Sequence, residues 1–305
     1  DVFQQPCCPG IQQFLRKYVP PVLPNLQHAV ISKRAAASLF KHSQIEATVM
    51  PDTLDFSMTP WTKDSYNEDL LSHFDVSEND ILILQATRIV KRKGIELLLP
   101  ILEKLNDKKY LKQLIGRKLY NGKTITESSK FILILAGYAE KEAVDYLNDI
   151  TSNLKSRNIP YRNIQAVIGA EREQRESGKQ YSLFDTYTFA DIVSYPSLFE
   201  GWGNQFLEAV FAKKPIIAFE YPVFITDIKP CGYEVISLGS TVLHDDQSGF
   251  LRLPNQIINN ACKSIVETLV SHETIKKLEN NFNVGKANNS RNTLKELMTK
   301  SLVLA

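Results

Sequence analysis

Two glutamates, Glu200 and Glu208, stand on either side of a glycine-containing loop in the stretch "SLFEGWGNQFLEA" at 197–209. Carboxylates accept hydrogen bonds from hydroxyl groups, and glycines let backbone N–H groups approach a ligand closely. A helix that begins in the same loop offers further N–H donors and a partial positive charge to an anion. Together these features indicate a polyhydroxylated, anionic ligand such as a nucleotide sugar.

The loop follows an apolar strand expected at 191–195 and precedes a helix that begins at Asn204 or Gln205. Ligands of open parallel sheets bind beyond the carboxyl ends of the strands, where this loop lies. Glu208 falls outside the apolar stripe of the helix and is free to face a ligand. Two alternatives remain open: a glutamate early in a helix is favourable in any case, and the glycines form only a tight turn. Trp202 either stacks on a sugar or packs beneath the loop.

A second group of chemistry-bearing residues follows the strand expected at 81–84. Arg88 and Lys93 precede Gly94 and the start of a helix. An arginine fork and a lysine point charge at such a place are suited to a diphosphate. The alternative is a solvent-facing basic turn, and the triplet Lys91-Arg92-Lys93 taken alone indicates a solvated face.

Five apolar strands alternate with amphipathic helices between residues 80 and 270, a pattern that predicts parallel strands joined by right-handed crossovers. The strands are expected at 81–84, 131–135, 164–168, 191–195 and 215–219. They are apolar throughout, as in a sheet covered on both faces. Residues 106–130 are expected to be a polar surface loop.

The two ends of the chain have different patterns. Near the N-terminus, strands at 29–31 and 47–50 flank a helix that Ser32 can cap. Residues 255–305 are expected to be helical, with an Asn-rich break near 280–292.

Composition excludes several classes of protein. The chain has 305 residues and a net charge of +2, which provides no field to attract nucleic acid. No apolar run approaches the ~20 residues of a membrane span. The four cysteines, Cys7, Cys8, Cys231 and Cys262, form no CxxC pair and have no histidine at metal-ligand spacing, which indicates free thiols and no metal site. We therefore expect a cytoplasmic protein, with a peripheral location at the inner membrane face as the alternative.

These residues resemble the retaining glycosyltransferases of family 4, which have the GT-B fold. Arg88-x₄-Lys93-Gly94 is similar to the family's diphosphate motif, and Glu200-x₇-Glu208 is similar to its paired-glutamate motif. Further matches are Ala136-Gly137 after the second strand, Asp191-Ile192, and Tyr195-Pro196-Ser197. The matches together cover residues 80–220.

The resemblance implies transfer of a sugar from a nucleoside diphosphate sugar to an acceptor hydroxyl, with retention of configuration and without a metal or other cofactor. UDP-glucose and GDP-mannose are both reasonable donors, and the acceptor is a small solute, a lipid or a glycan. It assigns catalytic roles to Glu200 at the transferred sugar and to Arg88 and Lys93 at the departing diphosphate. It assigns donor binding to Glu208 at the ribose, to the backbone of Gly201, Trp202, Gly203 and Asn204, to Gly137 by close approach, and to the neighbourhood of Ile168 at the base.

The resemblance also implies an α/β, GT-B-like architecture, in which a doubly wound C-terminal domain accompanies a partial N-terminal Rossmann-like domain. We expect a remnant of the acceptor-side domain at 1–79, the nucleotide-sugar-binding domain at 80–275, and a helical segment at 276–305 that packs back on the N-terminal part. Much of the family's first domain has no counterpart in 1–28, so the chain is expected to be a fragment or a truncated product. A catalytically incomplete binding module and a GT-B sugar-nucleotide epimerase remain alternative functions.

Overall fold

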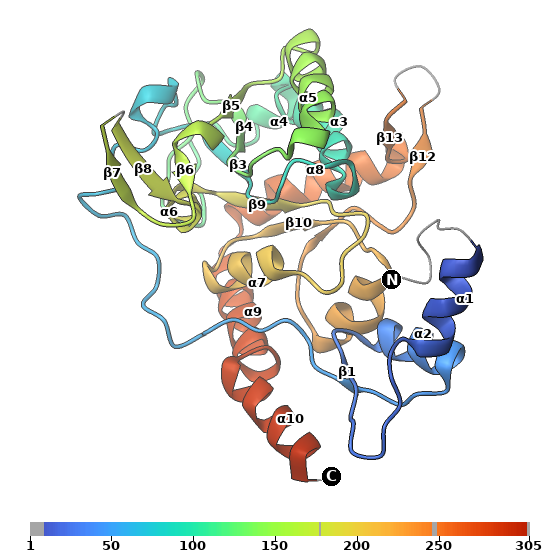
Figure 1. Cartoon of the computed structure of the whole chain (residues 1–305). Coiled ribbons are helices and arrows are strands. Elements are labelled where there is room, and N and C mark those ends of the chain that lie inside the picture. The colour runs from blue at the N-terminus through green and yellow to red at the C-terminus, as the bar shows by residue number, and fades with distance from the viewer. Residues whose placement is uncertain (1–8, 177, 246–248, 304–305) are drawn as a thin grey trace.

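The computed structural model describes residues 9–176, 178–245 and 249–303. Its centre is a parallel sheet of six strands in the order β11-β10-β9-β3-β4-β5, with helices on both faces (Figure 1). Its strands are β3 (Ile81–Gln85), β4 (Phe131–Leu135), β5 (Tyr161–Asn163), β9 (Ile192–Tyr195), β10 (Ile216–Ala218) and β11 (Ile236–Ser237). The doubly wound α/β class expected from the sequence is confirmed.

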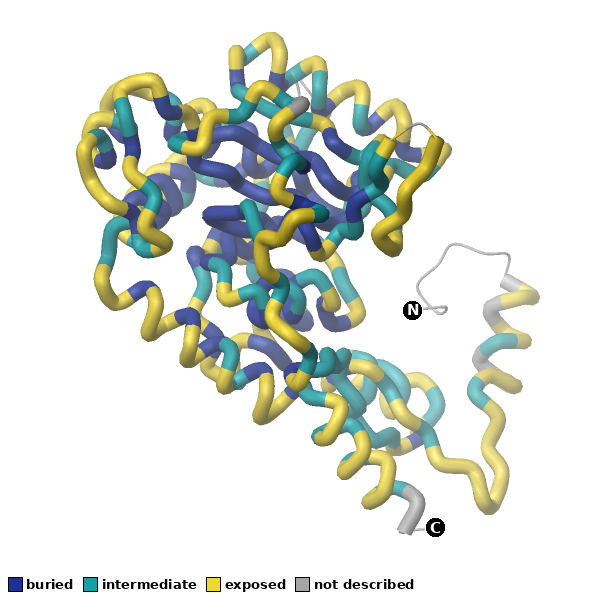
Figure 2. The backbone as a smooth tube through the Cα atoms, turned by 90° about the vertical axis from the view of Figure 1, so that its left-hand side faces the viewer, coloured by how far each residue is buried: buried dark blue, intermediate teal, exposed yellow. Residues whose placement is uncertain are grey.

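The central strands are buried on both faces because helices cover each side of the sheet. All five residues of β3 and of β4 are buried, and the same strands run through the dark core of Figure 2. In Figure 1, α3, α5 and α8 lie on one side, while α7 and α9 lie on the other. The helices of this part are α3 (Leu99–Leu105), α4 (Lys108–Leu111), α5 (Val144–Ser156), α6 (Leu183–Phe189), α7 (Asn204–Phe211), α8 (Asn255–Val270) and α9 (Thr274–Asn288).

The third strand was misplaced by its hydrophobic pattern. The prediction was 164–168, but β5 is Tyr161–Asn163, and a 3₁₀ turn follows at Gln165–Val167. β5 is an edge strand with polar side chains, and Arg162 Nη2 donates to the carbonyl of Asp75 at 2.6 Å. An edge strand needs no continuous apolar run. The hydrophobic pattern therefore predicted a strand at the apolar residues that follow β5 and not at β5 itself.

The segment 106–130 is not the loose polar loop that was expected. Leu114, Leu119 and Ile125 are buried, and the segment contains the short helix α4. Asn121 Nδ2 and Lys123 Nζ each reach a carboxylate oxygen of Asp191 at 2.6 Å. Asp191 also accepts the backbone N–H of Leu82 at 2.7 Å. The segment is therefore fastened to the amino ends of β3 and β9.

Small sheets and hairpins accompany the main sheet. A three-stranded sheet in the order β6-β8-β7 extends from the end of β5, and β12 and β13 form an antiparallel pair. Their bounds are β6 (Ile168–Gly169), β7 (Glu173–Arg175), β8 (Gly178–Ser182), β12 (Leu243–His244) and β13 (Leu251–Arg252).

The N-terminal part contains α1 (Pro9–Tyr18), β1 (Ala29–Val30), α2 (Lys33–Ser43) and β2 (Thr48–Val49), with β1 parallel to β2. Ser32 caps α2 as predicted, since its Oγ accepts the N–H of Ala35 at 3.2 Å. Figure 2 shows that much of this part is exposed.

The C-terminal helices return to the N-terminal part. The predicted Asn-rich break is narrower than expected, because α9 continues to Asn288 and α10 (Arg291–Val303) begins three residues later. Ser301 Oγ of α10 lies 3.3 Å from Thr48 Oγ1, and Asn289 Nδ2 donates to the carbonyl of Asp52 at 2.9 Å.

The cysteines that the structure describes, Cys231 and Cys262, are free thiols. Cys7 and Cys8 lie outside the described residues. Across the described ranges, no helix has the length and apolar character to cross a membrane.

Candidate functional site

The loops that follow β3 and β9 meet at the carboxyl edge of the sheet. The backbone N–H of Leu198 donates to the carbonyl of Arg92 at 2.9 Å. Gly94 has a φ of +60°, and a Cβ there would stand 2.5 Å from the carbonyl oxygen of Pro196. Glycine is therefore required at this position both for the backbone conformation and for the close approach of the two loops.

Glu200 lies between two cations from the 3₁₀ turn at Lys91–Lys93. Its Oε1 forms an ion pair with Lys93 Nζ, and its Oε2 lies 2.7 Å from Arg92 Nη1. The Lys93 side chain is 3% exposed, whereas that of Arg92 is 38% exposed. Burial lowers the pKa of Lys93, and the negative charge of Glu200 opposes that shift. The lysine is thus held in the site by a carboxylate of the other loop.

Glu208, in the second turn of α7, is half-buried and accepts a hydrogen bond from Tyr187 Oη at 2.8 Å. Burial raises the pKa of Glu208, while the hydrogen bond from Tyr187 and the positive charge of Lys93 act in the opposite direction. Lys93 therefore interacts electrostatically with both glutamates.

The backbone N–H of Gly203 at the start of α7 already has an acceptor. Asp52, from the N-terminal part, receives this N–H on its Oδ2 at 3.0 Å. Burial raises the pKa of Asp52, and the charge of Glu200 adds to that shift. A reciprocal contact exists nearby, because Asp227 Oδ1 accepts the N–H of Lys33, the first residue of α2, at 2.7 Å. The N-terminal part and the main domain thus each cap a helix of the other.

Trp202 packs beneath the loop rather than presenting its ring to the surface. Its side chain is buried, and its carbonyl accepts the hydroxyl of Tyr221. Of the two alternatives for this residue, the structure shows the packed one.

Arg88 lies in the same β3 loop and forms an ion pair with Glu140, which follows β4. Both side chains are more than a third exposed, so this pair contributes little to stability and its arginine is available for exchange. The backbone itself requires a glycine at position 137, because a Cβ there would come within 1.8 Å of the carbonyl oxygen of Thr87. The presence of Gly137 therefore does not depend on a ligand.

The remaining predicted donor-binding residues lie around this centre. Gly201 and Asn204 are exposed, and Ile31 of the N-terminal part faces Gly201. Ile168 is half-buried in β6, where it pairs with Tyr181 in the separate three-stranded sheet. The structure therefore brings Lys93, Glu200, Glu208 and Gly203 together, and it places Ile168 in a different element.

Three residues of the site were missed by sequence reasoning. The triplet Lys91-Arg92-Lys93 alone predicts a solvated face, but Arg92 and Lys93 both pair with Glu200, a partner from another loop that the spacing of the triplet does not reveal. Asp52 occupies a turn to which no function was assigned. Tyr187 carries no spacing signal relative to Glu208, because the two residues belong to different helices.

The fold is that of solved glycosyltransferases. A glycosyltransferase of Rickettsia africae superposes with a TM-score of 0.62 at 14% identity, covering 98% of this chain and 67% of the other. Anabaena Alr3699/HepE, solved in complex with UDP and glucose, superposes with a TM-score of 0.57 at 13% identity, covering 91% of this chain and 62% of the other. At these identities the likeness concerns the fold, and it confirms the expected GT-B-like architecture.

Two curated proteins are similar in sequence, and both are named mannosylglucosylglycerate synthase. The one from Petrotoga mobilis is 35% identical over 287 residues, and the one from Thermotoga maritima is 34% identical over 294 residues. The alignments cover 94% and 96% of this chain, but it spans only 64% and 65% of the relatives' lengths. No protein-family model matches the chain.

Proposed function

We propose that the protein is a glycosyltransferase that takes a sugar from a nucleoside diphosphate sugar bound at the edge of β3 and β9. The observation that carries the proposal is the position of Lys93, a buried cation that is paired with Glu200 and interacts with Glu208. A nucleotide sugar has the matching parts: a diphosphate for the cations and hydroxyl groups for the two carboxylates.

The chemistry proposed for this site is electrostatic. Arg88, Arg92 and Lys93 would exchange their present carboxylate partners for the oxygens of the diphosphate. They would then stabilise the charge that develops on this leaving group. Glu200 would lie against the transferred sugar, and its negative charge would favour an oxocarbenium-like centre. We propose that configuration at the anomeric carbon is retained and that no metal is required, as the resemblance to family 4 implies.

The curated relatives suggest a particular reaction. Their name describes a product composed of mannose, glucose and glycerate. We infer that this chain, or the protein to which it belongs, transfers a mannosyl group to a glucosylglycerate-like acceptor. A GDP- or UDP-linked donor fits this reaction, and the similarly folded Anabaena protein was solved with UDP.

Ligand-induced stabilisation tests the donor site directly. The melting temperature is measured with UDP, GDP and ADP for the wild type, for Glu208→Ala, and for Glu103→Ala, which removes an exposed carboxylate from α3. A ligand at 100 times its dissociation constant adds about 2.7 kcal/mol to the unfolding free energy. We expect one nucleotide to stabilise the wild type and Glu103→Ala but not Glu208→Ala. Absence of stabilisation by all three nucleotides would contradict the proposal.

Product analysis tests the reaction. GDP-mannose and UDP-glucose are incubated with glucosylglycerate or with no acceptor. The proposal expects a new glycoside in the presence of acceptor, with the anomeric configuration of the donor by NMR. Conversion of the nucleotide sugar in the absence of acceptor would instead identify an epimerase.

A further inference from the structure

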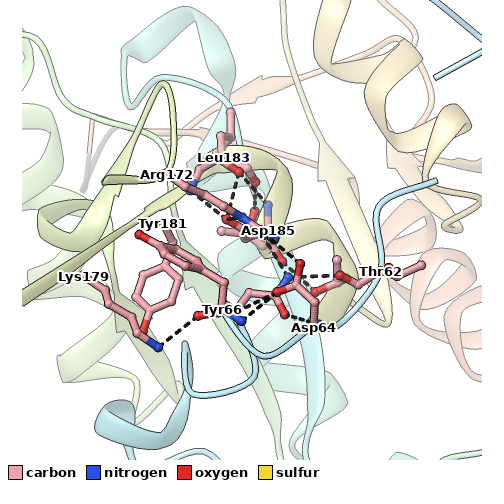
Figure 3. A network of polar contacts seen from close by, with 12 residues as sticks. Thr62, Asp64, Tyr66, Arg172, Lys179, Tyr181, Leu183 and Asp185 are labelled. Atoms are coloured by element: carbon pink, nitrogen blue, oxygen red, sulfur yellow. Dashed lines mark hydrogen bonds and ion pairs between the residues drawn. The ribbon is translucent and has the colours of Figure 1, made fainter. Parts of the chain in front are cut away.

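The segment 61–69 fastens the start of α6 to the hairpin formed by β7 and β8 (Figure 3). Arg172 binds Asp185 through Nε at 3.0 Å and Asp64 through Nη1 at 2.8 Å. Asn67 Nδ2 donates to Asp185 Oδ1 at 2.9 Å, and Tyr66 Oη donates to the carbonyl of Gln180 at 2.9 Å. The beginning of α6 is therefore held by charged and polar contacts from two separate segments.

This anchored helix carries Tyr187, which is fully buried and whose Oη donates to Glu208 Oε2 at 2.8 Å. The ring of Trp61, from the anchoring segment, lies 5.3 Å from the ring of Tyr187 and stacks on Phe184 at 4.4 Å. The pKa of Tyr187 lies well above its ordinary value because of burial and the adjacent carboxylate, so the hydroxyl keeps its proton and acts as a donor. Within the described ranges, no donor is bonded to Oε1 of Glu208.

We propose that Tyr187 is a positioning residue that makes the site specific for ribonucleotides: it holds Oε2 of Glu208 so that Oε1 is directed to the ribose diol. This inference rests on the proposed function and deepens it, because it assigns the sugar specificity of nucleotide binding to a residue that does not touch the ligand. Segment 61–69 supports the arrangement through Trp61 and through the anchoring of α6.

The physical reason is the cost of fixing a carboxylate. A glutamate without a partner populates several rotamers, and binding a diol would then have to order its side chain. A hydroxyl fixed in a buried ring removes this cost in advance, and a hydrogen bond to a charged acceptor is stronger than one between neutral groups. The benefit is confined to ligands that use Glu208, and this restriction makes the role testable.

Titration calorimetry on the full chain compares whichever of UDP and GDP binds more tightly with its 2′,3′-dideoxy analogue. Tyr187→Phe removes only the donor. We expect its affinity for the ribonucleotide to fall about tenfold, equivalent to about 1.4 kcal/mol, and its affinity for the dideoxy analogue to stay as in the wild type. Tyr120→Phe is the matched control, because Tyr120 Oη donates to the carbonyl of Asp191 at the opposite edge of the sheet. It should change neither affinity.

Two further variants distinguish a positioning role of Tyr187 from a general loss of folding in Tyr187→Phe. Trp61→Leu loosens the ring contact and should lower ribonucleotide affinity alone, by a smaller factor than Tyr187→Phe. In a Glu208→Gln background, the change Tyr187→Phe should have a reduced effect, since Tyr187 acts through Glu208. Equal losses for both ligands in Tyr187→Phe and Trp61→Leu, or an unchanged ribonucleotide affinity in Tyr187→Phe, would overturn the inference. If the wild type binds neither UDP nor GDP, it is the proposed function that fails.

Discussion

Replacing Glu200 with glutamine should destabilise the protein, because it leaves the buried Lys93 without its counter-ion. The side chains of Lys93 and Glu200 are 3% and 11% exposed, so water can solvate neither well. Removing one partner of a buried pair costs about 3–5 kcal/mol. We expect about 3 kcal/mol for Glu200→Gln, at the lower end of that range, since the glutamine oxygen can still accept a hydrogen bond from Lys93.

Urea unfolding followed by circular dichroism measures this cost in a double-mutant cycle. Lys93→Met should cost less than Glu200→Gln, because Arg92 remains beside the carboxylate. The double variant should be more stable than the sum of the two single changes predicts, by about 2 kcal/mol, because it contains no uncompensated buried charge. Arg92→Met is the matched control: its 38% exposed side chain predicts a cost of about 1 kcal/mol or less.

Two results would refute this reasoning. Additive costs in the double variant would mean that Lys93 and Glu200 are not energetically coupled. A Glu200→Gln variant more stable than the wild type would mean that repulsion between Glu200 and Asp52 outweighs the attraction of the cations, as occurs where function is maintained at the expense of stability.

Three other predictions concern pH, charge and metal. Burial raises the pKa of Glu208, so the folded state favours the protonated carboxyl. The stability that this side chain contributes is therefore fully present below its ordinary pKa of 4.5 and is lost as the pH rises through its pKa in the folded protein. Glu208→Gln should therefore melt higher than the wild type at pH 7 but not below pH 4.5, and an equal difference at both would contradict this. Asp52→Asn keeps an acceptor for the N–H of Gly203 but removes the negative charge of Asp52. This change removes about 1 kcal/mol of repulsion between Asp52 and the phosphates of a bound nucleotide. Its affinity for UDP or GDP should rise roughly fivefold by calorimetry, and a fall would show that the charge is needed. Chelation with EDTA should leave nucleotide-induced stabilisation unchanged, since the site supplies its own cations; restoration of a lost shift by Mg²⁺ would identify a metal requirement.

Much of the main sheet was predictable, because buried parallel strands leave a clear apolar signal. β3 and β4 are continuous runs of Ile, Leu and Phe, apart from Gln85. The failure at β5 has the opposite cause, since an edge strand is free to carry polar residues such as Arg162. The prediction for segment 106–130 was wrong because its buried hydrophobic residues, Tyr110, Leu114, Leu119 and Ile125, are scattered among charged ones.

The sequence predicted which loops form the site, but it did not predict which side chains pair with one another there. Topology alone brings the residues after β3 and β9 to one edge of the sheet, as expected for Lys93 and Glu200. Which carboxylate pairs with which cation depends on side-chain geometry within a 3₁₀ turn. The contact of Asp52 with Gly203 depends on where the N-terminal part sits, and no local pattern records that placement.

The fastening of Asp191 has a consequence for how the protein can change over evolution. This carboxylate fixes the axial position of β9 at its amino end, where it binds Asn121, Lys123 and the N–H of Leu82. The opposite end of the same strand leads into the loop 196–203 that carries Glu200. The contacts that align β9 with its neighbours thus lie at its amino end, and the proposed functional residues follow its carboxyl end. Mutations in the loop can therefore be explored with little penalty to strand alignment, whereas a substitution at Asp191 would disturb the placement of every residue beyond it.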